Sequence, residues 1–178
     1  SNMKIGLCGT MSVGKTTLVN ALQELDYFKG YNFRTERSKE LMAQGIPLNT
    51  DSTLLGQTVF LAERASELMH ENIITDRTVI DVIAFARASK SMNYLDKEDF
   101  TDYAKHLIRE YDYIFYVSPE GVEIEDNGIR ETDAEYRKEI DMIIDHTIMR
   151  NRHRIKNLIK ISGSTEERMS KIISSINS

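Results

Sequence analysis

Residues 9–16, with the sequence GTMSVGKT, constrain the fold of this chain more than any other segment. They match the pattern G-x-x-x-x-G-K-[ST], in which glycines allow a tight turn whose backbone N–H groups surround a bound phosphate. The apolar run of residues 3–8 predicts a strand before the turn, and residues 15–25 carry apolar side chains at a helical spacing after it. Because the pattern requires both neighbours, their agreement favours a phosphate-binding loop over a chance match.

The side chains and the backbone of this loop have separate predicted roles. Lys15 is expected to reach the β and γ phosphates of a nucleoside triphosphate, and the Thr16 hydroxyl to bind Mg²⁺. The helix that follows adds the positive end of its dipole. The predicted nucleotide-binding residues are Gly9, Thr10, Met11, Ser12, Val13, Gly14, Lys15, Thr16 and Thr17. The loop indicates that ATP or a similar ligand binds, but it does not identify the reaction.

The rest of the chain alternates between strand and helix patterns. Apolar or β-branched runs predict further strands at residues 32–35, 73–76, 113–117 and 157–161. Amphipathic segments predict helices at about 36–43, 54–71, 79–86, 96–109, 133–152 and from 165 onward. This alternation predicts an α/β fold with a parallel sheet of about five strands and helices on both faces. Ligands of such sheets bind outside the carboxyl ends of the strands.

Length and composition predict a single domain over residues 1–178, because nothing in the sequence resembles a linker. Residues 1–2, ahead of Met3, look like a cloning remnant. No apolar run approaches the roughly 20 residues that cross a bilayer, so no membrane partner is expected. Cys8, the single cysteine, fits a buried position in a reducing compartment, which favours a cytoplasmic location. The four histidines form no zinc motif, so Mg²⁺ is the one metal implied.

The net charge of -5 argues against a protein that coats nucleic acid, so no nucleic-acid partner is expected. One dense basic cluster nevertheless stands out: Arg150, Arg152, His153, Arg154 and Lys156. It has two interpretations, a polyanion site or cations that gather at the negative end of a long helix. The helix-end interpretation is favoured.

Several short segments together resemble a known family. They are the phosphate loop, Thr-Glu-Arg at 35–37, Gln-Thr-Val-Phe at 57–60, Asp-Arg-Thr at 76–78 and Asp-Asn-Gly-Ile-Arg at 126–130. Their order is similar to that of P-loop nucleoside and nucleotide kinases, most of all the nicotinamide-riboside-kinase-like branch, and more distantly deoxynucleoside and thymidylate kinases. The resemblance implies a three-layer P-loop NTPase fold that transfers the γ-phosphoryl of ATP·Mg²⁺ to a nucleoside or nucleoside monophosphate. A guanine-binding Asn-Lys-x-Asp motif is missing from the sequence, which disfavours a Ras-type GTPase.

The resemblance also implies roles at the carboxyl ends of the second and third predicted strands. Asp76 is expected to organise the Mg²⁺ shell, and Arg77 to reach a phosphate or the acceptor's 5′-oxygen. The alternative, in which Asp76 only caps the next helix and Arg77 faces solvent, is disfavoured. Asp81 either orients Arg77 or faces water. Glu36 is either a base that positions the acceptor hydroxyl or a helix-start acid paired with Arg37 or Lys39.

Two further segments carry candidate substrate and nucleotide contacts. Gln57, Phe60 and Arg64 share one helix face, where Gln57 can pair with a base edge and Phe60 can stack on it, or where all three belong to a core stripe. The polar segment 119–132 is expected to be a lid that delivers Arg130, and with it Arg137, to the phosphates. Arg137 could instead pair with Asp133 or Asp141.

These residues favour an enzyme whose partners are ATP and a small nucleoside-type acceptor. The alternative is a nucleotide-dependent switch, which would bind ATP without phosphorylating an acceptor. The cluster of candidate acceptor groups argues against the switch, because a switch needs no second pocket. A homodimer is one possible assembly.

Overall fold

The computed structural model describes residues 2–35, 38–46, 48–120 and 131–178. The strands are β1 (Lys4–Cys8), β2 (Asn32–Arg34), β3 (Ile73–Thr75), β4 (Tyr113–Val117) and β5 (Leu158–Ile161). The α-helices are α1 (Lys15–Gln23), α2 (Ser38–Ala43), α3 (Leu54–Glu67), α4 (Val79–Arg87), α5 (Tyr94–Ala104), α6 (Glu131–Arg150) and α7 (Thr165–Asn177). Short 3₁₀ helices are η1 (Asp26–Phe28), η2 (Lys105–Glu110) and η3 (Arg152–Arg154).

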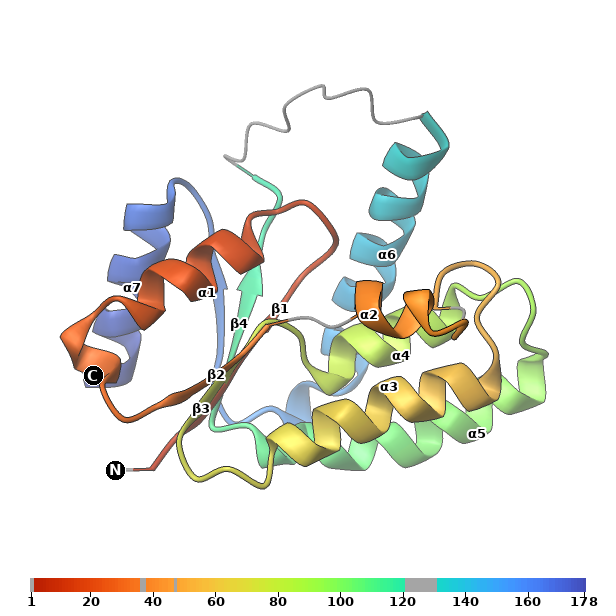
Figure 1. The fold of residues 1–178 in the computed structure, drawn as a ribbon, viewed down its shortest axis with the longest axis horizontal. Helices are drawn as coiled ribbons and strands as arrows, with labels where there is room; N and C mark the ends of the chain where they lie inside the picture. The colour runs from red at the N-terminus through yellow and green to blue at the C-terminus, as the bar shows by residue number, and fades with distance from the viewer. Residues whose placement is uncertain (1, 36–37, 47, 121–130) are drawn as a thin grey trace.

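The sheet is parallel throughout, with the strand order β2-β3-β1-β4-β5. Figure 1 shows α1 and α7 on one face of this sheet and α3, α4, α5 and α6 on the other. The expected three-layer α/β architecture with five strands is therefore confirmed. Because all strands point the same way, the segments that follow β1, β2, β3 and β4 meet at one edge of the sheet.

The side chains of each central strand alternate between the two faces of the sheet, so each strand packs against both helix layers. In β1, Ile5 and Leu7 belong to the apolar core beneath α1 and α7, whereas Cys8 belongs to the core beneath α3 to α6. In β4, Phe115 and Ile114 divide between the same two cores. Burial on both faces explains why these strands read as continuous apolar runs. None of the helices in the described ranges has the length and apolar character needed to cross a bilayer.

Gly6 brings the start of α4 unusually close to β1. A Cβ at this position would lie 2.5 Å from Thr78 Cγ2 and 2.8 Å from Tyr111 Cε1, so any larger residue would push these groups away. The Tyr111 hydroxyl in turn accepts a hydrogen bond from Val79 N at 3.1 Å. This close packing fixes the first turn of α4 beside the segment that follows β1.

Some helix boundaries differ from the sequence prediction. The predicted helix at 96–109 is divided into α5 and η2, and α6 ends at Arg150 rather than at 152. Ser164 is the N-cap of α7, and Glu167 completes a full capping box with it.

Candidate functional site

The loop between β1 and α1 has the backbone that its glycines permit. Gly14 caps α1 with a left-handed φ of 83°, and Ser12 adopts φ 61°. A Cβ on Gly9 would lie 2.7 Å from Val117 O, which explains the need for glycine at the close approach to β4. The turn is therefore held on both sides, by β4 and by the first turn of α1.

The backbone amides of residues 10–17 are donors without described partners, in the loop that leads into α1. Within the described part of the chain, none of these amides donates a hydrogen bond to a protein group. Backbone N–H groups without partners normally bind water or a ligand, and a row of them at a helix N-terminus is a phosphate site.

Lys15 is buried inside this loop rather than extended into solvent. Its Nζ donates hydrogen bonds to Gly9 O at 2.7 Å and Thr10 O at 2.6 Å. Burial, followed by the charge of Arg77, lowers the pKa of Lys15 to about 8. An anion bound to the loop would stabilise the charged ammonium and offset both effects.

Thr16 and Asp76 come together from neighbouring strands. Asp76 follows β3, the strand next to β1, and its Oδ2 accepts a hydrogen bond from Thr16 Oγ1 at 2.7 Å. A hydroxyl beside a carboxylate matches the oxygen ligands that Mg²⁺ takes from proteins, alongside water and substrate phosphates. Groups of three or more His, Cys, Asp or Glu that could hold a metal by themselves are missing from the described ranges. The Thr16 hydroxyl and the Asp76 carboxylate are the residues whose chemistry fits Mg²⁺.

Asp81 links the phosphate loop to Arg77. Its side chain is fully buried and accepts hydrogen bonds from Gly9 N at 3.0 Å and Thr78 N at 2.7 Å. Arg77 Nη1 lies 3.5 Å from Asp81 Oδ1, and the guanidinium lies over the Phe85 ring, 4.8 Å from its centroid. Of the two alternatives for Asp81, the structure shows the one in which it orients Arg77.

Gln57 and Phe60 lie beside a group of aromatic rings. Gln57 is fully buried; its Nε2 donates to Leu48 O at 3.4 Å, while its Oε1 has no partner in the described ranges. The Phe60 ring lies 6.4 Å from that of Phe85, which in turn lies 6.4 Å from that of Tyr136. The Tyr136 hydroxyl is also buried without a partner among the described residues. Buried groups of this kind are rare and call for an explanation, such as a ligand.

Arg64 has an intramolecular partner. Its Nη2 lies 2.5 Å from Glu67 Oε1, and its guanidinium lies over the Phe60 ring, 5.1 Å from the centroid. Burial raises the pKa of Glu67 to about 7, and the charge of Arg64 only partly opposes this rise. The predicted substrate contact of Arg64 stays a prediction, and the observed role is a buried ion pair behind Phe60.

Part of the predicted site lies outside the described residues, whereas Arg137 lies within them. Glu36, Arg130 and most of the predicted lid segment 119–132 lie outside the described residues. Arg137 O accepts a hydrogen bond from Thr10 Oγ1 at 2.8 Å, which joins α6 to the phosphate loop. Its Nη1 is buried without a partner in the described part of the chain. Of its two expected alternative partners, Asp141 accepts a hydrogen bond from Tyr116 instead, and the side chain of Asp133 is not among those the structure describes.

Arg168 is a residue of the site that the sequence reasoning missed. It lies in the first turn of α7 with a side chain 3% exposed. Nη1 donates to Val13 O at 2.5 Å and Nη2 to Ser118 O at 3.0 Å, so one guanidinium connects the phosphate loop to the end of β4. Its spacing from Ile172 and Ile176, on the buried face of α7, is the signal that could have identified it.

Comparison with solved structures identifies similar folds. Deoxyadenosine kinase from M. mycoides, solved with dCMP and dCDP, is 18% identical, with 98% of both chains covered and a TM-score of 0.70. Thymidylate kinase from Ehrlichia chaffeensis is 14% identical, with 98% of both chains covered and a TM-score of 0.63. NadR, solved with NAD and AMP-PNP, is 16% identical over 99% of this chain but 49% of its own, with a TM-score of 0.71. No curated protein matches the sequence.

The family assignment comes from the sequence itself. A family model described as an AAA domain, AAA_28, matches residues 4–168, which is nearly the whole chain. The predicted resemblance to nucleoside and nucleotide kinases is confirmed by the fold of the structural neighbours. The chain belongs to the AAA_28 family of AAA domains, and its fold is that of the P-loop nucleoside and nucleotide kinases.

Proposed function

We propose that this protein transfers the γ-phosphoryl group of ATP·Mg²⁺ to a nucleoside or a nucleoside monophosphate. The observation that carries the proposal is the phosphate loop itself. The backbone amides of residues 10–17 donate no hydrogen bond to any protein group that the structure describes. Lys15 and the Thr16–Asp76 pair belong to the same site. This arrangement supplies donors for phosphate oxygens, a point charge and a cation site at one edge of the sheet.

The proposed chemistry depends on positioning and charge rather than on a covalent intermediate. Lys15 would exchange the carbonyls of Gly9 and Thr10 for β and γ phosphate oxygens. Thr16 and Asp76 would hold Mg²⁺, which when bound neutralises charge on the same oxygens. Arg77, fixed by Asp81 and Phe85, would face the group that is transferred. Arg130 and Arg137 stay the predicted cations of the lid.

A contiguous set of side chains supports an acceptor site next to the phosphates. Gln57 lies one turn from Phe60, the Phe60 ring adjoins Phe85, and Arg77 covers Phe85. Gln57 Oε1 lacks a partner in the described ranges and could accept a hydrogen bond from a base, whereas Phe60 is 1% exposed and belongs to the apolar core, so its observed role is packing. Glu36 is the proposed group that orients an acceptor hydroxyl. A deoxyadenosine kinase and a thymidylate kinase among the structural neighbours agree with this class of acceptor.

The experiment is incubation with ATP·Mg²⁺ and a panel of nucleosides, nucleoside monophosphates and nicotinamide riboside, followed by mass spectrometry. We expect one acceptor class to gain a phosphoryl group. The Lys15→Ala variant provides the background, because it removes the charge at the phosphates but no apolar core volume. Consumption of ATP without any phosphorylated acceptor would favour the nucleotide-dependent switch instead.

A further inference from the structure

A second polar cleft lies away from the phosphate loop, between α4, α5 and the C-terminal end of α6. Its volume is ≈ 310 Å³, within the roughly 300–1,000 Å³ of ordinary small-molecule sites. Its basic lining residues are Arg87, Lys105, His146, Arg150, His153 and Arg154. None of these residues belongs to the proposed site for ATP or its acceptor.

Of the four arginine and lysine side chains that line the cleft, two are neutralised within it and two are not. Arg87 Nη1 lies 2.9 Å from Glu98 Oε1, and Lys105 Nζ lies 3.0 Å from Asp102 Oδ1. Within the described part of the chain, Arg150 and Arg154 have no carboxylate partner.

Arg154 in particular is incompletely satisfied. Its Nη1 approaches His106 Nδ1 at 3.4 Å, and its Nε is buried with no partner among the described residues. Four cations and two carboxylates give the cleft a formal charge of about +2, on a chain whose net charge is -5. Such a local reversal of sign concentrates anions at the cleft.

The end of α6 accounts for part of this cluster, because Arg150 lies in its last turn, at the negative end of the helix dipole, as the sequence interpretation expected. The carbonyls of Thr147 and Ile148 have partners, because Asn151 N donates to Thr147 O at 3.1 Å and to Ile148 O at 3.2 Å, and Asn151 Nδ2 donates to Thr147 O at 2.9 Å. Among the described residues, Arg150 makes no hydrogen bond to these carbonyls. The dipole therefore stabilises the charge of Arg150 without a described hydrogen bond to its guanidinium, which leaves these donors available to an anion.

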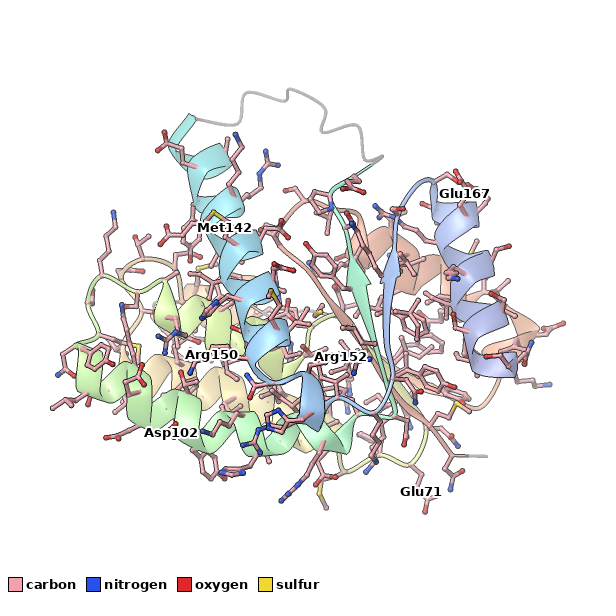
Figure 2. All side chains as sticks on the ribbon, turned by 180° about the vertical axis from the view of Figure 1, so that it is seen from behind. Glu71, Asp102, Met142, Arg150, Arg152 and Glu167 are labelled. Carbon is pink, nitrogen blue, oxygen red and sulfur yellow. The ribbon has the colours of Figure 1, made fainter. Side chains whose placement is uncertain are left out.

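The structure also divides the basic cluster of the sequence. Arg152 Nη1 donates to Ile155 O at 3.2 Å, and Arg152 lines a different cleft beside Tyr116 and Asp141. Lys156 Nζ lies 3.7 Å from Asp112 Oδ1. Figure 2 shows Arg150 on the side of α6 toward α5 and Asp102, with Arg152 on the opposite side. Only Arg150, His153 and Arg154 of that cluster line the cleft described here.

We propose that this cleft binds a small anion that carries a diphosphate or triphosphate group. Arginine offers a planar set of donors that matches phosphate oxygens, and two arginines without carboxylate partners can bind adjacent phosphates. Two histidines, His146 and His153, line the same cleft and can donate hydrogen bonds to an anion. The volume of the cleft is that of a small-molecule site, and its positive charge favours an anion. The proposal is independent of the function proposed above.

The test is a titration of the protein with inorganic pyrophosphate, followed by ¹H–¹⁵N NMR. The phosphate loop also attracts pyrophosphate, so the titration is done in parallel on Lys15→Ala. We expect saturable shifts at residues 150–154 in both proteins, and shifts at residues 9–17 that weaken in Lys15→Ala. The residues whose NMR signals shift therefore distinguish binding at the cleft from binding at the phosphate loop. The measurement does not depend on enzymatic activity.

Arg150→Gln is the main variant, because Arg150 is exposed and its replacement removes no described contact. We expect it to raise the pyrophosphate Kd at the cleft at least about fivefold, and Arg150→Gln/Arg154→Gln to abolish the cleft shifts, without changing the loop shifts. Arg152→Gln is the matched control and should leave the Kd within about twofold. Unsaturable shifts, an equal loss in Arg152→Gln, or binding of oligoglutamate but not pyrophosphate would overturn the proposal.

Discussion

Replacing Arg168 with Met tests whether this residue holds the phosphate loop in shape. Met keeps much of the apolar stem of the side chain but removes the donors to Val13 O and Ser118 O. Hydrogen bonds from a charged donor contribute about 1.5–3 kcal/mol each to the free energy of unfolding. Part of this loss is offset, because the Met variant no longer has to bury a charged guanidinium. We therefore expect the free energy of unfolding to fall by about 2–4 kcal/mol.

The same substitution should weaken ATP binding, because Val13 lies inside the loop and loses its attachment. Urea denaturation measures the change in stability, and calorimetric titration with the ATP analogue AMP-PNP and Mg²⁺ measures the affinity, which we expect to fall at least about tenfold. Arg109→Met is a control at an exposed position. Arg168→Lys should recover part of both effects. A stability loss below about 1 kcal/mol together with unchanged affinity would refute the reasoning.

Three further predictions concern the site itself. The pKa of Lys15 is lowered to about 8, and a bound phosphate would raise it. ATP affinity measured by calorimetry should therefore fall roughly tenfold per pH unit above about pH 8, whereas the affinity of Lys15→Arg should not change with pH in this range. Asp76→Asn should lower Mg²⁺-dependent turnover at least about tenfold with a smaller change in ATP binding, and equal rates across a Mg²⁺ titration would contradict this. Gln57→Leu should raise the KM for the acceptor and leave the free energy of unfolding unchanged or slightly higher, because it removes a buried Oε1 without a described partner. An unchanged KM for every acceptor would instead favour a role for Gln57 in the core.

The fold was predictable because its signals are local. The loop pattern, the apolar runs and the helical spacings each specify one element, and parallel strands place their following segments at one edge. That reasoning predicted the meeting of Thr16 and Asp76, which the structure shows at 2.7 Å. The strand order did not follow from it, because the sequence patterns do not say which strand pairs with which.

The parts of the site that were missed depend on contacts between distant segments. Arg168 reaches Val13 across 155 positions of sequence, and Asp81 reaches Gly9 across 72. Helical spacing showed that Arg64 shares a face with Gln57, but it could not show that the face is buried and that Glu67 takes the guanidinium. A charged residue on an apolar helix face is the one pattern that would have indicated such contacts.

The central claim is that the γ-phosphoryl group passes to an acceptor rather than to water. ATP labelled with ¹⁸O in the γ-phosphoryl oxygens tests it directly, by mass spectrometry of every phosphorylated product formed with the acceptor panel. The account predicts that the labelled group appears in a nucleoside monophosphate or diphosphate and that Lys15→Ala abolishes this product. Label found only in inorganic phosphate, with every acceptor unchanged, would contradict the account.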